Sequence, residues 1–366
     1  MKTSGRGDSP RSIQERKGLA PRSRWYKWIG SILFPVASLA LLLVLGFTAE
    51  DVHLAWTALL RVSPRYVAVV AACWCAYVGI RALALVVFCR FQGCSLKVGG
   101  ALHVTLIGLF YSGITPAATG GQPMQVYELA KRGVHASAGA SAVAVETAGF
   151  QFMLVILATC FWLAFRGAIG ATISVAKWVL IGGFALNFVW TVFLALVLAR
   201  GAWVARPVEW TIRLLGRARL LRSPQRSIER LREYVAEYES ISEQMFRRPA
   251  LIIVCALMSG AQVTAYMSMV YFIYRGFGWS AAPYGVVTGI QMLLYLVASM
   301  VPTPGATGAQ EGSFYVFLGK VFPESSVFPA MLVWRFFTYY LMLLAGALTL
   351  LAGMVRLRVR RAEPAD

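Results

Sequence analysis

Two short segments of the chain have nearly the same sequence: Thr115-Pro-Ala-Ala-Thr-Gly-Gly-Gln122 and Thr303-Pro-Gly-Ala-Thr-Gly-Ala-Gln310. They agree at six of eight positions and lie 188 residues apart. Each proline lacks a backbone N–H and disfavours helix at the residue before it, and the glycines permit tight turns. Since both segments lie within apolar sequence, they predict two helices that are broken at the same place. Chance similarity is the alternative, because small residues are frequent in membrane helices.

The sequence around these segments is strongly apolar. Hydrophobic residues make up 58% of the 366 positions, charged residues make up 14%, and the mean hydropathy is +0.64. A soluble domain carries about 25% charged residues. Several apolar runs approach the roughly 20 residues that cross a bilayer as a helix. We therefore expect an all-α, polytopic membrane protein, with apolar runs at 29–47, 66–88, 136–165, 173–199, 250–274 and 328–354.

Positive charge is concentrated next to the apolar runs. The formal net charge is +19, and Lys and Arg cluster in residues 1–28, 200–248 and 356–361. This is the positive-inside pattern, in which basic residues mark the cytoplasmic side and attract anionic lipid. The pattern argues against nucleic-acid binding. It predicts a cell-membrane protein with both termini in the cytoplasm.

The basic clusters also constrain the path of the chain. If all three are cytoplasmic, both 101–131 and 284–320 must enter and leave on one face, and 101–114 is too short to span comfortably. We predict about six full spans and two re-entrant helical hairpins in an inverted repeat. Such repeats with broken helices are typical of secondary transporters, whose substrate site lies near the repeat interface. The predicted organisation is a basic tail (1–28), a transmembrane half (29–199) with the first repeat (66–165), a cytoplasmic connector (200–249) with one amphipathic helix, the second repeat (250–355) and a tail (356–366).

The residues of the two breaks suggest an anion site. Thr119 with Gln122, and Thr307 with Gln310, have the spacing of a capping box, which begins a helix. Helix N-termini offer free backbone N–H groups to anions, and a lipid phosphate suits such a site. The alternative is a hairpin that only packs. The candidates for substrate binding in the breaks are Thr115, Pro116, Thr119, Gly120, Gly121, Gln122, Thr303, Pro304, Gly305, Thr307, Gly308 and Gln310.

Five charged residues interrupt the apolar segments: Arg81, Glu128, Glu146, Glu311 and Arg335. A charge at the centre of a membrane helix costs about 2.5–3.5 kcal/mol on insertion scales, so each needs a partner or a wet site. Glu146 and Arg335 hold nearly equivalent positions in the two repeats. We predict that they face each other, either as a structural ion pair or in function. Arg335 is the stronger candidate for phosphate, because its guanidinium matches that group. Arg81 either extends to the interface or binds a head group.

Little in the sequence indicates an enzyme. The three histidines, His53, His103 and His135, have no ligand partner at helical spacing, and the six cysteines show no zinc spacing. The sequence contains neither a nucleotide-binding loop nor a nucleophile elbow. We therefore expect no metal, no cofactor and no catalytic residue, although enzyme activity is left open.

Three motifs resemble a known family: Thr115-Pro-Ala-Ala-Thr-Gly-Gly-Gln-Pro-Met-Gln125, Pro302-Thr-Pro-Gly-Ala-Thr-Gly-Ala-Gln-Glu-Gly312 and Trp334-Arg-Phe-Phe-Thr-Tyr-Tyr340. Together they resemble the transmembrane domain family of lysylphosphatidylglycerol synthetase/flippase proteins, from about the first span to the last. Ala306 and Ala309 replace residues that are often Gly or Ser in that family. The resemblance implies movement of an aminoacylated phospholipid between leaflets, which gives resistance to cationic antimicrobial peptides. Tyr339 in the third motif joins Glu311 and Arg335 among the substrate-binding candidates.

Fused relatives in that family carry a soluble domain that transfers lysine from its tRNA to phosphatidylglycerol. This sequence ends at Asp366, just after the last span, so we expect no such domain and do not carry over the family's transferase name as an activity.

The leading hypothesis is a flippase-like transporter of a phosphate-containing lipid, such as lysyl-phosphatidylglycerol or another modified lipid. In it, Glu128, Glu146 or Glu311 meets a cationic head group or a coupling proton. One alternative is the membrane part of a phosphatidylglycerol lysyltransferase system that acts with a separate lipid-modifying enzyme. Another is an ion or small-solute transporter. A homo-oligomer is compatible with all three.

Overall fold

Helices account for nearly all of the backbone that the structure describes. The computed structural model describes residues 62–173, 177–200, 202–217 and 224–362, and these contain helices and turns but no strand. The predicted tail at 1–28 and the predicted span at 29–47 lie outside the described residues, as do the last four residues of the C-terminal tail. All described residues belong to one unit, 46–366. The predicted all-α class is confirmed.

The first repeat consists of a long helix, a broken pair and a second long helix. Pro64 begins the first helix at a position where a missing N–H is not needed, and the helix ends just before Gly93, whose φ is 75°. The elements are α3 (Pro64–Phe91), α4 (Val98–Ile114), the 3-10 turn η1 (Pro116–Ala118), α5 (Gly121–Ala130) and α6 (Ala136–Ala164).

The second repeat has the same order of elements. Its last long helix contains a π-helical turn, η5, between two α-helical parts. The elements are α11 (Pro249–Gly276), α12 (Tyr284–Ala298), η3 (Pro304–Ala306), α13 (Ala309–Ser313), the π-helix η4 (Phe314–Leu318), α14 (Glu324–Arg335), η5 (Phe336–Tyr340) and α15 (Leu341–Ala362).

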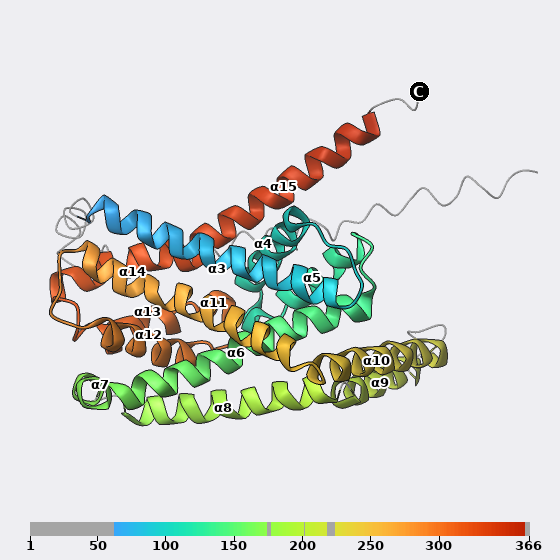
Figure 1. Ribbon diagram of the computed structural model, residues 1–366, viewed down its shortest axis with the longest axis horizontal. Coiled ribbons are helices and arrows are strands. Elements are labelled where there is room, and N and C mark those ends of the chain that lie inside the picture. Colours follow the sequence, from blue (N-terminus) through green and yellow to red (C-terminus); the bar gives the residue numbers. More distant parts are fainter. Residues whose placement is uncertain (1–61, 174–176, 201, 218–223, 363–366) are drawn as a thin grey trace, which may run out of the picture. The chain divides into compact units, whose positions relative to one another are not determined.

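The first helices of the two repeats run in opposite directions. The backbone N–H of Ser63, just before α3, donates to the carbonyl oxygen of Gly276 at the end of α11, with N and O 2.9 Å apart. Farther along, the rings of Tyr77 and Tyr266 are in contact, with centroids 4.8 Å apart. Figure 1 shows α3 and α11 side by side along their length. The packing therefore agrees with equivalent helices of opposite orientation.

In the described residues, four helices join the repeats: α7 (Arg166–Ile173), α8 (Lys177–Ala199), α9 (Ala202–Arg217) and α10 (Pro224–Phe246). Helix α10 corresponds to the amphipathic helix predicted in the connector, and α9 precedes it. They pack together (Figure 1), and Arg232 of α10 donates to both carboxylate oxygens of Glu209 of α9, at 2.7 and 3.0 Å. The hydrogen bond from Arg232 holds the pKa of the Glu209 carboxyl below its usual range.

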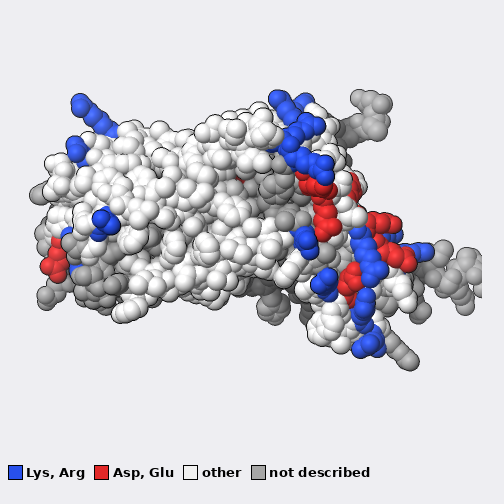
Figure 2. All heavy atoms as spheres, turned by 60° about the horizontal axis from the view of Figure 1, so that its bottom comes forward, with Lys and Arg blue, Asp and Glu red and all other residues white. Residues whose placement is uncertain are grey.

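Several of the described helices have the length and apolar composition of membrane spans. Four are long and apolar enough to cross a bilayer: Pro64–Phe91, Ala136–Ala164, Pro249–Gly276 and Glu324–Gly353. Three shorter apolar helices accompany them: Val98–Ile114, Leu180–Leu196 and Tyr284–Ala298. Figure 2 shows charged side chains gathered at the two ends of one face, with a wide, almost uncharged surface between them. The chain is a polytopic membrane protein.

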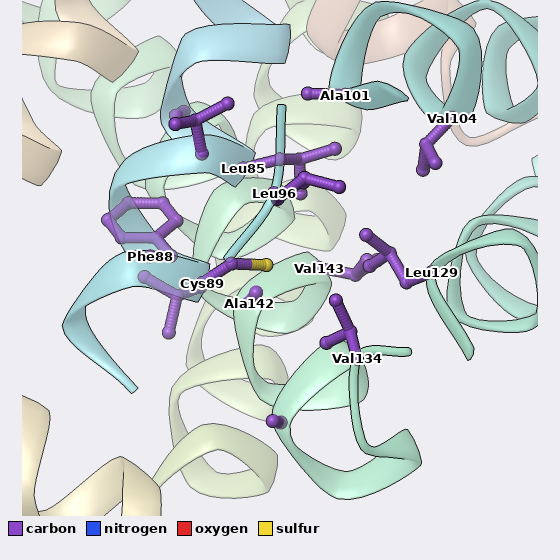
Figure 3. Close-up of a cluster of buried hydrophobic side chains, with 14 of the residues drawn as sticks. Leu85, Phe88, Cys89, Leu96, Ala101, Val104, Leu129, Val134, Ala142 and Val143 are labelled. Atoms are coloured by element: carbon purple, nitrogen blue, oxygen red, sulfur yellow. The ribbon is translucent and has the colours of Figure 1, made fainter. Parts of the chain in front are cut away.

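A cluster of buried apolar side chains holds the first broken pair against its neighbours. Figure 3 shows the sulfur of Cys89 of α3 directed toward Val143 of α6, and Phe88 and Ala142 belong to the same buried cluster. Leu129 near the end of α5 joins the same cluster. Small residues on α6 let the helix backbones approach closely, as in other membrane bundles. The cluster fixes the end of α5 that lies farther from the break.

Candidate functional site

The two helix breaks lie against each other. Turn η1 of the first repeat packs on turn η3 of the second, and α4 also contacts η3. Tyr339 of η5 connects the halves, because its hydroxyl donates to the carbonyl oxygen of Gly113 at 3.3 Å. The structure therefore brings together the candidate residues of the two breaks, although they are far apart in sequence.

In both breaks, the two residues after the proline have the same unusual backbone conformation. Ala117 and Ala118 in the first break have φ values of 51° and 55°, and Gly305 and Ala306 in the second have values of 60° and 50°. Residues other than glycine rarely adopt positive φ, and such strain clusters at functional sites. Two successive left-handed residues reverse the chain after each proline. The two breaks are therefore similar in backbone conformation at these positions as well as in sequence.

The first break is held by Thr115, not by the predicted capping box. Oγ1 of Thr115 donates to the carbonyl oxygen of Tyr111 at 2.6 Å and accepts the N–H of Gly120 at 2.9 Å. Thr119 donates to the carbonyl oxygen of Pro116 at 3.0 Å, so it caps no helix. Helix α5 begins at Gly121, and Gln122 is half-buried within it. The capping-box prediction is wrong here, because the threonine hydroxyl closes the local turn instead.

Close packing requires the two glycines of the first break. A Cβ atom on Gly121 would lie 1.9 Å from Oγ of Ser112 and 2.8 Å from the carbonyl oxygen of Gly108. A Cβ atom on Gly120 would lie 2.6 Å from Cγ2 of Thr115. The start of α5 therefore rests directly on α4. Pro116 and Thr119, at the outer edge of the turn, are exposed.

The second break replaces the predicted threonine cap with a carboxylate. Thr307 donates to the carbonyl oxygen of Pro304 at 2.9 Å, and Thr303 donates to the carbonyl oxygen of Thr307 at 2.9 Å. The N–H of Gly308, with a φ of 86°, donates instead to Oε2 of Glu311 at 2.7 Å. The capping-box prediction is wrong here too. Helix α13 has only five residues before the π-helix η4, so it offers no long helix dipole to an anion.

Arg335 is the charged centre of the second break. Its Nε donates to Oε1 of Glu311 at 2.6 Å, and the two side chains are 3% and 6% exposed. Its Nη atoms lie 3.3–3.4 Å from the carbonyl oxygen of Gly305, and Nη2 lies 3.3 Å from Oγ1 of Thr307. The guanidinium carbon also lies 4.8 Å from the ring centroid of Tyr339. Arg335 therefore joins α14 to both sides of the break.

Tyr339 covers the second break closely. A Cβ atom on Gly305 would lie 2.2 Å from Cε2 of the Tyr339 ring, so only glycine fits beneath that ring. Pro304 is buried, and the side chain of Gln310 is also buried, with no hydrogen-bond partner for its Oε1 among the described residues. Four candidates of the second repeat thus contact Arg335: Gly305, Thr307, Glu311 and Tyr339.

The predicted pairing of Glu146 with Arg335 is wrong. Glu146 accepts a hydrogen bond from Nη2 of Arg81 at 2.8 Å, with Glu146 1% exposed. Nη1 of Arg81 donates to the hydroxyl of Tyr77 at 2.7 Å. The two charges at equivalent positions therefore each find a partner within their own repeat. Arg81 neither extends to the interface nor stands free for a head group, although its Nε and Oε1 of Glu146 have no partner among the described residues.

Glu128 belongs to a different cluster. It lies near the end of α5, seven residues after the start of that helix and thus about 10 Å from the break. Lys131 and Arg132 donate to its carboxylate at 2.8 and 2.7 Å, and Nε2 of His103 lies 3.5 Å away. The structure does not bring Glu128 to the two breaks.

Sequence reasoning missed several buried polar and aromatic residues between the repeats. Tyr77, Phe150, Tyr266 and Tyr295 form a closed ring of contacts between α3, α6, α11 and α12. Asn187 of α8 donates to the carbonyl oxygen of Leu296 at 3.2 Å and accepts a hydrogen bond from Gln151 of α6. A search for every amide side chain within an apolar run would have found Gln151 and Asn187. Nothing in the sequence singles out the tyrosines.

Comparison with known proteins gives one family. A family model described as the lysylphosphatidylglycerol synthase TM region matches residues 28–346. A protein from Archaeoglobus fulgidus described as a UPF0104 membrane protein is 22% identical over 292 residues, which cover 75% of this chain and 82% of that relative. The motifs that carry the resemblance lie within the matched range. The chain belongs to the family of the lysylphosphatidylglycerol synthase TM region.

Proposed function

We propose that this protein is a flippase-like transporter that moves a phosphate-containing lipid between the leaflets of the cell membrane. The observation that carries the proposal is the contact between the two breaks, with the buried guanidinium of Arg335 beside it. Broken helices that meet at a repeat interface are the usual place of a transporter's substrate site. A buried arginine is well suited to a phosphate, which accepts hydrogen bonds from its planar fork.

The topology in this proposal has about six spans and two hairpins that enter the bilayer from opposite faces. The antiparallel α3 and α11 support it, as does the length of α4 and α12, 17 and 15 residues. Neither helix is long enough to cross the hydrocarbon core unaided. Both termini are then cytoplasmic, and the basic clusters bind anionic lipid on that side.

Exposure of the first break supports a polar path through the protein. Residues 116–119 are exposed, and their backbone includes two residues with positive φ. Irregular backbone at membrane depth is tolerated only within protein or beside water. In the proposal, the lipid head group passes this open turn, while Arg335 holds its phosphate and the acyl chains stay in the bilayer.

Leaflet transfer in proteoliposomes tests the proposal. The purified full chain is reconstituted in vesicles of phosphatidylcholine and phosphatidylglycerol with a trace of phosphatidylglycerol that carries a fluorescent acyl chain. A membrane-impermeant reductant then removes the fluorescence of the outer leaflet. If the protein transfers the lipid, nearly all the fluorescence should be lost. In protein-free vesicles, only about half should be lost. The Arg335→Gln variant should be slower by about 10–100-fold, because it lacks charge-assisted hydrogen bonds to phosphate.

Matched variants make the test specific. Arg335→Lys retains the charge and should keep part of the activity, and Arg232→Gln removes an exposed arginine of the connector and should transfer lipid at the wild-type rate. An Arg335→Gln protein that is folded and transfers lipid as fast as wild type would remove Arg335 from the mechanism. No transfer of any phosphate lipid by the wild type, together with uptake of an ion or solute, would favour a solute transporter.

The name of the family favours a second function. The matched model is described as the membrane region of a lysylphosphatidylglycerol synthase, so this chain is also a candidate for the membrane part of a lysyltransferase system that acts with a separate enzyme. Radioactive lysyl-tRNA supplied to the purified chain with phosphatidylglycerol tests the activity. Labelled lipid formed by this chain alone would establish a transferase. Labelling that requires a second protein would establish the partnership.

A further inference from the structure

The carboxylate of Glu311 accepts hydrogen bonds from two donors of the second break, the guanidinium of Arg335 and the backbone N–H of Gly308. Oε1 accepts from Nε of Arg335 at 2.6 Å, and Oε2 accepts from the N–H of Gly308 at 2.7 Å. The side chains of Glu311 and Arg335 are almost completely buried. A guanidinium and a backbone N–H that converge on two oxygens of one anion are also the donors that proteins use to hold phosphate.

The remaining donors of Arg335 are only weakly engaged. Nη1 and Nη2 lie 3.3–3.4 Å from the carbonyl oxygen of Gly305, longer than the usual 2.7–3.2 Å of such bonds. The carboxylate of Glu311 takes Nε alone, so the two Nη atoms do not meet a carboxylate in the bidentate fork that arginine prefers. Arg335 therefore keeps unused capacity for an anion larger than the one it now holds.

We propose that Glu311 is a tethered anion that fills the phosphate site of the second break, and that it must take up a proton and release Arg335 before a lipid phosphate can bind. This inference rests on the proposed function and adds a coupling step to it. A phosphate that entered beside an ionised Glu311 would place two negative charges against one buried guanidinium, which is unfavourable in a low-dielectric site. Protonation converts the carboxylate to a neutral carboxylic acid, and the phosphate then takes its place as counter-ion.

The charges balance over the cycle. In the closed state, one positive guanidinium faces one negative carboxylate. In the loaded state, the guanidinium faces one negative phosphodiester, and the carboxyl is neutral. One proton is therefore taken up as each phosphate binds and is given back when the phosphate leaves, so lipid and proton move in the same direction.

Only two other charged side chains lie in the segment around this break. Residues 284–340 contain four charged side chains, Glu311, Arg335, Lys320 and Glu324, and no histidine. Glu324 begins α14, about 16 Å along that helix from Arg335. The titratable groups that face the pair from neighbouring elements are Tyr339 of η5 and Tyr266 of α11.

Arg81 and Glu146 of the adjacent first repeat are paired with each other. On α3, which packs against η5, Arg81 is bound to Glu146 of α6. In the proposal, the proton that accompanies phosphate binding is therefore assigned to Glu311, which is the carboxylate in contact with Arg335.

The pH dependence of binding tests the inference. The probe is glycerophosphoglycerol, the deacylated head group of phosphatidylglycerol, whose phosphodiester keeps one negative charge between pH 5 and 8. Binding to the purified full chain is measured by calorimetry across this range. For the wild type, affinity should rise as pH falls, by up to about tenfold per pH unit while Glu311 is ionised. Glu311→Gln, a neutral isostere of the protonated state, should bind with wild-type low-pH affinity at every pH.

Control variants separate this inference from the proposed function. His103→Gln and His135→Gln remove the two histidines of the described residues, and both should keep the wild-type pH dependence. A wild type whose affinity is independent of pH would overturn the inference, as would a Glu311→Gln variant that still depends on pH or no longer binds. Glu311→Asp, too short to reach both donors, should show weaker pH dependence if the glutamine variant does not fold. Absence of both binding and lipid transfer in every variant would instead defeat the proposed function.

Discussion

At the scale of single residues, four of the charged residues in the apolar segments form two buried ion pairs. Arg81 with Glu146 joins α3 to α6, and Glu311 with Arg335 joins the second break to α14. A buried pair contributes little net stability against well-packed apolar residues, but removing one partner leaves an uncompensated charge. Neither Arg81 nor Glu146 belongs to a break, and the expected role of this first pair is structural. The second pair is part of the break itself.

Replacement of one member of the structural pair should destabilise the protein. Arg81→Met leaves Glu146 buried without a counter-ion, and the free energy of unfolding should fall by about 3–5 kcal/mol. The double variant Arg81→Met/Glu146→Leu should recover most of that loss, since no unpaired charge remains. Thermal unfolding of the detergent-purified protein measures both. A single variant as stable as wild type, or a double variant no better than the single, would contradict the assigned pair.

The same residues show where sequence reasoning stops. The charged positions were visible, because each interrupts an apolar run. Their partners were not, because equivalent positions in two repeats give depth along a helix but not rotation about it. One residue of displacement turns a side chain by about 100°. Glu146 and Arg335 are one residue out of register, and they point to different neighbours.

At the scale of elements, the two breaks combine strained backbone with very close packing. The position of each break could be predicted from Pro116 and Pro304, because proline interrupts helical hydrogen bonding. The capping pattern could not, because Thr119 and Thr307 close their own turns and leave the helix starts to other groups. Choice between such local hydrogen bonds depends on the turn geometry, which the spacing of residues does not reveal.

Substitution by alanine should distinguish glycines that are required for close packing from glycines that can be replaced. Gly121→Ala places a Cβ atom 1.9 Å from Oγ of Ser112 and close to the backbone of Gly108, so α5 must move away from α4. We expect a loss of about 1–3 kcal/mol in the free energy of unfolding. Gly79→Ala is the control, because no atom lies within 4 Å of its Cβ position in the middle of α3. Gly79→Ala should stabilise the helix by up to about 1 kcal/mol.

Thermal unfolding of the two alanine variants tests whether α5 packs on α4 at Gly121. Equal effects of Gly121→Ala and Gly79→Ala would show that the start of α5 does not rest on α4. Such a result would remove the packing argument for the first break.

At the scale of the whole molecule, the account depends on two repeats of opposite orientation. The repeated order of helices, the contact between η1 and η3, and the antiparallel α3 and α11 all support it. The repeat could be predicted from the two similar segments and the basic clusters. The contact between the breaks was expected only from analogy with transporters, since sequence similarity between two segments does not place them together. The ring of Tyr77, Phe150, Tyr266 and Tyr295 was not predicted at all.

Side-specific labelling at the ends of the two broken pairs measures this orientation directly. Single cysteines replace Lys131, just after α5, and Lys320, just after η4, in a chain whose six native cysteines are replaced; both positions are exposed. Right-side-out and inverted membrane vesicles are treated with a membrane-impermeant maleimide. The account predicts that position 131 reacts only from the cytoplasmic side and position 320 only from the opposite side. Reaction of both positions from the same side would contradict the inverted repeat and the lipid path built on it.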